Sequence, residues 1–134
     1  GSAAAMVRAL RATGVKPEQV DYVNAHATST LIGDVSEAKA LRTVFKDPQA
    51  QPAISSTKAL TGHGLSLAGA MESGFSMLAL REGFMPGSAH ITQLDPACNG
   101  LRILRATENV KPEIVLKNSS GFGGANVALL FKSV

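Results

Sequence analysis

The fold is decided by residues 20–30, which read VDYVNAHATST. Residues 20–24 have the β-branched and aromatic content of a short strand. The small, polar residues that follow contain His26. Residues 53–55 (AIS) repeat this arrangement, because they are strand-like and precede a small polar turn that ends at His63. The sequence therefore predicts two short strands, each followed at its carboxyl end by a turn that contains a histidine.

Helical patterns accompany these strands. Residues 3–13 are mostly helix formers, and Gly14 after them is a typical helix stop. Apolar residues repeat at helical spacing from Asp34, which we expect to cap that helix. Residues 65–81 form a third helical stretch of mainly small and apolar side chains, and its only acidic residue is Glu72. A helix that is small or apolar nearly all round is expected in an interior, with other backbone packed closely against it.

Three more strands are predicted over residues 101–104, 114–118 and 126–131, after a loop-like stretch at 86–100. The alternation of helices and strands indicates a layered α/β architecture. The 134 residues have the length of one domain. In α/β proteins, polar loops at the carboxyl ends of strands commonly carry the chemistry, so the two histidine turns are the first candidates for a functional site.

Composition excludes several classes of protein. Hydrophobic residues make up 45% of the chain, which is enough for a core and argues against disorder. A net charge of +3 without a basic run makes a nucleic-acid partner a poor prediction. No apolar stretch approaches the roughly 20 residues of a membrane span, so we expect no membrane partner. A single cysteine cannot form an internal disulfide, and we expect a soluble protein of the reducing cytoplasm.

The residues alone leave the chemistry of the two turns open. His26 and His63 could be structural hydrogen-bonding groups, which is the commoner case for a histidine among small residues, or catalytic groups. A metal site is not predicted, because no carboxylate or cysteine accompanies either histidine at ligand spacing. The glycine-rich residues 121–124 fit a tight turn between two strands, or a loop whose N–H groups face a ligand oxygen.

Four segments of the chain resemble, in the same order, the segments NAHGTST, GDxxE, SxTKxxTGH and NSFGFGGxN of the β-ketoacyl-[acyl-carrier-protein] synthases. They are residues 24–30 (NAHATST), 33–37 (GDVSE), 55–63 (SSTKALTGH) and 118–126 (NSSGFGGAN). The resemblance spans essentially the whole chain. It implies that residues 1–134 are the C-terminal domain of such an enzyme, with the thiolase-like fold, as one half of a five-layer αβαβα architecture. The cysteine nucleophile belongs to the N-terminal half, which this chain does not contain.

The resemblance also implies an activity in fatty acid or polyketide synthesis. Members of the family join an acyl thioester to malonyl-carrier protein with loss of carbon dioxide. His26 and His63 match the two histidines that stabilise the enolate formed in that step. Lys58 matches the active-site lysine, and we expect it to pair with Glu37 in a charge network that orients His63.

Further positions match the substrate-facing parts of the family. Thr28 and Thr30 match residues that hydrogen-bond the phosphopantetheine arm. Phe122, between Gly121 and Gly123, matches the gating aromatic of a mobile loop whose backbone N–H completes an oxyanion hole. No cofactor is implied.

Some positions depart from the family pattern. Ala27 replaces a glycine beside His26, and its Cβ restricts that turn. Ser120 replaces a phenylalanine in the wall of the malonyl pocket. Ser66 and Leu67 replace smaller residues after His63, and repacking must absorb their volume. These changes leave the catalytic groups in place and affect the expected substrate preference.

Two residues of the loop at 86–100 match nothing catalytic. Cys98 lies in a Pro-bounded stretch and is not expected to be the nucleophile, so iodoacetamide should not label it unusually fast below neutral pH. His90 is expected to be a surface or packing residue.

The implied partners are an acyl carrier protein and the N-terminal half of the synthase, in a homodimer when complete. The isolated chain is expected to be inactive. An alternative function is a non-catalytic partner subunit that sets chain length, although such a subunit would not need His26, Lys58 and His63 together. A thiolase is a third and weaker possibility, because thiolases need a cysteine beside a histidine in the late glycine-rich segment, and residues 121–124 have neither nearby.

Overall fold

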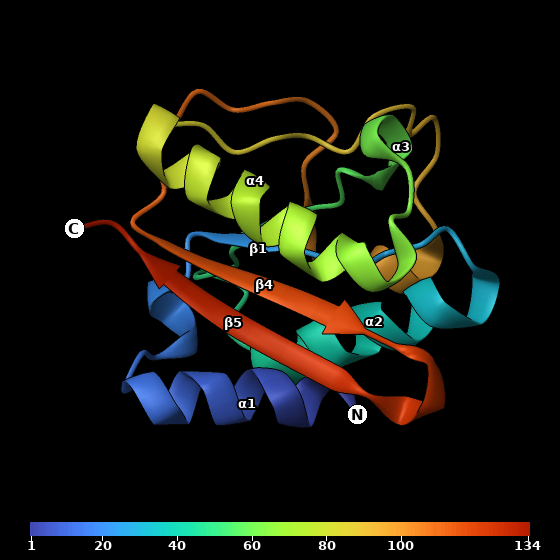
Figure 1. Ribbon diagram of the computed structural model, residues 1–134, viewed down its shortest axis with the longest axis horizontal. Helices are drawn as coiled ribbons and strands as arrows, with labels where there is room; N and C mark the ends of the chain where they lie inside the picture. The colour runs from blue at the N-terminus through green and yellow to red at the C-terminus, as the bar shows by residue number, and fades with distance from the viewer.

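A computed structural model describes residues 1–134, and its centre is a single five-stranded sheet with the order β3-β2-β1-β4-β5. The first four strands are parallel, and β5 is antiparallel to β4. Figure 1 shows α4 on one face of the sheet, with α1 and α2 on the other. The strands are β1 (Tyr22–Asn24), β2 (Ala53–Ser55), β3 (Arg102–Ile103), β4 (Ile114–Ser120) and β5 (Asn126–Lys132). The α-helices are α1 (Ser2–Thr13), α2 (Leu31–Val44), α3 (Lys58–Thr61) and α4 (Ala68–Glu82). Four short 3-10 turns are η1 (Pro17–Gln19), η2 (Leu65–Leu67), η3 (Pro96–Cys98) and η4 (Phe122–Gly124).

Side chains of the central strands alternate between the two faces of the sheet, as the strand period of two requires. Val23 and Leu116 belong to a core cluster that they share with residues of α1 and α2. Tyr22 and Val115 belong to a separate cluster that includes Leu80 of α4. The sheet therefore separates two packed layers, and a residue's position along a strand decides which layer it enters.

Most of the predicted elements are confirmed, and the boundaries of α1 agree closely with the prediction. Gly14 ends α1 in the left-handed conformation, with φ 70°, which a glycine adopts at little cost. The glycine-rich stretch after β4 is a tight connection between the antiparallel strands β4 and β5, so the turn interpretation of residues 121–124 is confirmed. Gly123 and Gly124 both have positive φ there.

The start of α2 corrects one prediction. The helix begins at Leu31 with Thr30 as its N-cap, three residues earlier than the pattern from Asp34 indicated. Asp34 lies in the first turn and accepts hydrogen bonds from the backbone N–H groups of Thr28 and Ser29, at 3.1 and 3.2 Å. It therefore secures the turn before the helix, including Ser29 in its left-handed conformation at φ 64°.

The segment after β2 differs from the prediction in two ways. A short helix, α3, begins at Lys58, and the long helical stretch is divided into η2 and α4. Within this chain α4 is covered on one side, and Met77 and Leu78 on its outer side are exposed. Its inner side does pack closely, since a Cβ on Gly69 would come within 3.3 Å of the Ser119 hydroxyl on β4.

The strand order brings the two histidine turns together. β1 and β2 are parallel neighbours with Asn24 opposite Ser55, so their carboxyl ends lie at the same edge of the sheet. The turn with His26 follows β1, and Lys58 and His63 follow β2. None of the helices has the length and apolar character needed to cross a membrane.

Candidate active site

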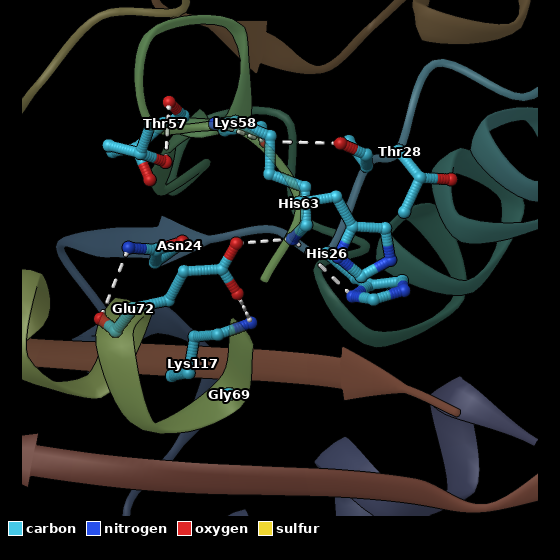
Figure 2. A network of polar contacts seen from close by, with 12 residues as sticks. Asn24, His26, Thr28, Thr57, Lys58, His63, Gly69, Glu72 and Lys117 are labelled. Carbon is cyan, nitrogen blue, oxygen red and sulfur yellow. Dashed lines mark hydrogen bonds and ion pairs between the residues drawn. The ribbon is translucent and has the colours of Figure 1, made fainter. Parts of the chain in front are cut away.

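Two imidazole rings lie against each other at the carboxyl ends of β1 and β2. The ring centroids of His26 and His63 are 5.4 Å apart, and the planes meet edge to face at 83°. Figure 2 shows both rings on the same side of the Lys58 side chain. His26 is partly buried and His63 is exposed. Two residues that are 37 positions apart in the sequence thus present their rings to one small space.

The hydrogen-bond partners of the rings indicate which nitrogen carries the proton in each neutral imidazole. His63 Nδ1 is 3.2 Å from the backbone N–H of Leu65, which can only donate. His26 Nδ1 is 3.5 Å from the Lys58 ammonium, which also has no lone pair to offer. Both Nδ1 atoms must therefore accept, and the proton of each neutral ring lies on Nε2. Each neutral ring therefore has one Nε2–H group available as a donor.

His26 is held in its neutral form. Burial, followed by the positive charges of Lys58 and Lys117, lowers its pKa from 6.5 to about 4. Protonation of a partly buried imidazole beside an ammonium group is unfavourable because both desolvation and charge repulsion oppose it. At neutral pH the ring is therefore uncharged and its N–H group can act as a donor.

A cluster of three buried charges lies beneath the histidines. Glu72, on α4, forms an ion pair with Lys58 through one carboxylate oxygen and with Lys117 of β4 through the other, the latter at 2.8 Å. The exposed fractions of the three side chains are 7% for Lys58, 3% for Glu72 and 1% for Lys117. Figure 2 shows Glu72 between the two ammonium groups, with Lys58 extending from this pair toward His26.

The predicted ion pair between Lys58 and Glu37 is therefore wrong. Lys58 pairs with Glu72. Its ammonium group approaches the ring of His26, whereas the prediction had the charge network orienting His63. The physical reason is the layering of the fold: Glu37 lies on α2, which covers one face of the sheet, whereas Glu72 lies on α4, which covers the other (Figure 1).

Glu37 organises the His26 turn from the opposite face. Its carboxylate accepts hydrogen bonds from the backbone N–H groups of His26 at 2.8 Å and Ala27 at 2.7 Å, and from the Asn118 amide at 2.8 Å. Asp34 binds the next two N–H groups of the same turn. The two carboxylates together fix four consecutive backbone N–H groups, and so fix the position from which the His26 ring projects.

We predict that Glu37→Gln lowers the free energy of unfolding by about 1.5–3 kcal/mol. The amide has one acceptor oxygen where the carboxylate has two, so one of the three buried donors must lose its partner. Urea denaturation measures the effect, and Glu18→Gln, in the short turn η1, is the matched control with a change below about 0.5 kcal/mol. Equal stability of the two variants would contradict this description of Glu37.

The other predicted site residues lie in the turn before α2 and in the connection between β4 and β5. The Thr28 and Thr30 hydroxyls are 3.2 Å apart at the start of α2. Phe122 is 96% exposed at the tip of the turn between β4 and β5, and Gly121 and Gly123 flank it. The structure thus gives these residues accessible positions, and their substrate contacts stay predictions.

Cys98 is not placed to act as a nucleophile. Burial and the nearby carboxylate of Asp95 raise the pKa of its thiol, which disfavours the reactive thiolate. It lies in η3, beside the apolar side of a pocket that Leu94, Ile103 and residues of α2 also line. No group of three or more His, Cys, Asp and Glu side chains is positioned to hold a metal ion.

Three polar residues of the site were missed as functional candidates. Glu72 is the only charged residue between Leu65 and Leu80, in a stretch of small and apolar residues, and this isolation is a usable signal. Lys117 interrupts the buried run of β4, and Asn118 follows it. A charged residue inside a buried strand needs a partner of opposite charge. Which residue is that partner depends on which helix covers that face of the sheet.

Comparisons with known proteins agree with the motifs. Residues 1–92 match the family model described as "Beta-ketoacyl synthase, C-terminal domain". The chain belongs to the β-ketoacyl synthase family. The mitochondrial 3-oxoacyl-[acyl-carrier-protein] synthase of Arabidopsis thaliana is 46% identical over 100% of this chain and 30% of its own length. The 3-oxoacyl-[acyl-carrier-protein] synthase 1 of Escherichia coli K12 is 45% identical over 86% of this chain and 28% of its own.

Solved β-ketoacyl synthases have the same architecture. The ishigamide ketosynthase/chain length factor superposes with a TM-score of 0.94 at 31% identity, covering 100% of this chain and 33% of that one. A β-ketoacyl synthase from Burkholderia phymatum gives 0.92 at 34% identity over 99% of this chain. The predicted thiolase-like fold is confirmed. The chain spans only about 30% of the curated relatives' length.

Proposed function

We propose that this chain is the part of a decarboxylating condensing enzyme that removes carbon dioxide from malonyl-carrier protein. The observation that carries the proposal is the facing pair of His26 and His63, each with Nδ1 engaged as an acceptor and Nε2 free to donate. Membership of the β-ketoacyl synthase family is consistent with this chemistry. The reaction would serve fatty acid or polyketide synthesis.

The chemistry needs stabilisation of an enolate oxygen. When the carbon–carbon bond to the malonyl carboxylate breaks, its electron pair moves into the thioester and carbon dioxide leaves. Negative charge then collects on the thioester oxygen. Two neutral N–H donors placed around that oxygen stabilise the charge without having to titrate during the step.

The enolate carbon would then attack an acyl thioester on a cysteine, forming the new carbon–carbon bond and expelling the cysteine thiolate. That cysteine would come from an N-terminal half. An apolar outer surface supports this partner: Leu65, Leu67, Met77 and Leu78 are between 40% and 66% exposed on η2 and α4. Contiguous apolar side chains on a surface commonly mark an interface.

The remaining substrate contacts follow the family positions. Thr28 and Thr30 would bind the phosphopantetheine arm of the carrier protein, and the loop with Phe122 would gate the entrance. One solved relative is described as a type II polyketide synthase acyl-carrier protein in complex with its ketosynthase, and the match covers 100% of this chain and 33% of that chain at 29% identity and a TM-score of 0.93. A carrier protein is accordingly the partner we propose.

A non-catalytic subunit that sets chain length is the second candidate, because the solved relatives include ketosynthases with chain length factors. The joint presence of both imidazoles and Lys58 in one cluster favours the catalytic function. A subunit that only shapes a pocket has no chemical use for a pair of neutral donors.

Product formation from acyl- and malonyl-carrier protein tests the proposal. We expect none from the isolated chain, and condensation when the chain is joined to a cysteine-bearing N-terminal half. Condensation by the isolated chain would contradict the requirement for that half. A correctly assembled complex that binds malonyl-carrier protein and releases no carbon dioxide would favour the non-catalytic subunit.

A further inference from the structure

Lys117 is an unusual residue for its position. It follows Ile114, Val115 and Leu116 in β4, all of them buried apolar residues, and its own side chain is only 1% exposed. It lies opposite Asn24 of β1 in the strand register. Like Asn24, it projects to the face of the sheet that α4 covers, where it reaches Glu72.

Glu72 is shared between two ammonium groups. One oxygen pairs with Lys58 and the other with Lys117, so each carboxylate oxygen has its own cation. With both lysines protonated, two positive charges and one negative charge leave the buried cluster with one net positive charge. Only Lys58 of the two cations reaches the imidazole of His26.

Stability does not explain this arrangement. Buried ion clusters lose the hydration of each charge, and apolar side chains of similar volume are often as stable or more so. A methionine in β4 would continue the apolar run of residues 114–116. The ammonium of Lys117 must therefore be explained by what it does to the groups around it.

We propose that Lys117 is a positioning residue for the decarboxylation site: it anchors Glu72 from the side opposite Lys58 and leaves the buried cluster beside His26 with one net positive charge. This inference rests on the proposed function, because that function requires a neutral His26 as a hydrogen-bond donor to the enolate oxygen. Lys117 does not touch the substrate, since its side chain is enclosed between β4 and α4.

The charges that face His26 come from every element around it. Lys58 of α3 and Lys117 of β4 oppose its protonation, Glu72 of α4 favours it, and His63 opposes it weakly. On the α2 side, Glu37 and Asp34 are engaged by backbone N–H groups of the turn. Burial of Lys117 lowers its own pKa, and Glu72 counteracts this effect.

The test measures the pKa of His26 by NMR titration of labelled histidine side chains in the complete synthase. It compares the wild type, Lys117→Met and the double variant Lys117→Met/Glu72→Gln. In Lys117→Met the cluster is neutral, and we expect the pKa of His26 to rise by about one pH unit. The double variant again has one net positive charge, and we expect the pKa to return most of the way to about 4. Lys132→Met removes the same charge from an exposed site on β5 and should leave the pKa unchanged.

A purely structural lysine would behave differently: the double variant would then be no closer to the wild type than Lys117→Met. That result, or an unchanged pKa in Lys117→Met, would overturn the proposal. If the methionine variant does not fold, Lys117→Gln gives the same comparison with a polar side chain. The measurement is independent of activity. If His26 titrates as expected in the wild type but the enzyme releases no carbon dioxide, the proposed function is refuted and the inference about Lys117 is not.

Discussion

Replacement of His63 by alanine lowers the rate of condensation by about 100- to 1000-fold, the usual effect of removing one donor to a developing oxyanion. The expectation follows from the geometry, because the Leu65 N–H occupies Nδ1 and leaves Nε2–H for the substrate. The measurement is the steady-state rate with saturating acyl- and malonyl-carrier protein in the complete synthase. Since the His63 side chain is exposed, the melting temperature should change little.

His90 provides the matched control for this experiment. It is also exposed, and it has a left-handed backbone with φ 64°, so His90→Asn is the appropriate replacement. We expect full activity from this variant. A loss of less than about tenfold in His63→Ala would contradict a donor function for this ring.

Glu72→Gln should lower the free energy of unfolding by about 3–5 kcal/mol, because it leaves two buried ammonium groups without their counter-ion. Urea denaturation measures the change. Glu82→Gln, on the same helix, removes one half of an exposed ion pair with Arg81 and should cost less than about 1 kcal/mol.

Adding Lys117→Met to Glu72→Gln should recover part of the lost stability, because the second substitution removes one of the two unpaired charges. Additive losses in the double variant would mean that Glu72 and Lys117 do not interact, contrary to their 2.8 Å contact.

The layered fold and the histidine pair could be predicted from the sequence. Two strand-like stretches, each followed by a small polar turn, place His26 and His63 at one edge of a parallel sheet once β1 and β2 are neighbours. The spacing of the histidines did not predict a catalytic role, since a histidine among small residues is more often structural. The family motifs predicted that role. The boundaries were less secure, as Asp34 illustrates: its carboxylate binds the turn before α2 and does not cap the helix.

The carboxylate that pairs with Lys58 could not be predicted. Glu37 lies in a recognisable motif, whereas Glu72 lies in no motif, although it is nearer to Lys58 in the sequence. Their assignment depends on which face of the sheet each helix covers, and that is a property of the tertiary fold. The partner of Lys117 could not be predicted for the same reason. A lysine in a buried strand indicates that a carboxylate lies nearby, but the sequence does not show which one.

Both polar networks serve the same ring from opposite faces of the sheet. Glu37 fixes the backbone of the His26 turn, and the cluster of Glu72, Lys58 and Lys117 sets the charge around its imidazole. A site built in this way controls the position and the protonation of His26 separately, which is why the Glu37 and Lys117 variants are expected to affect different measurements.

Carbon dioxide release from malonyl-carrier protein tests the central claim most directly, when the complete synthase has its nucleophilic cysteine replaced by alanine. This replacement stops condensation, so the rate reports decarboxylation alone. The account predicts that release persists in this enzyme and falls by about 100- to 1000-fold when His26→Ala is added. Release at an unchanged rate without His26 would contradict the claim that this chain carries the decarboxylating half of the site.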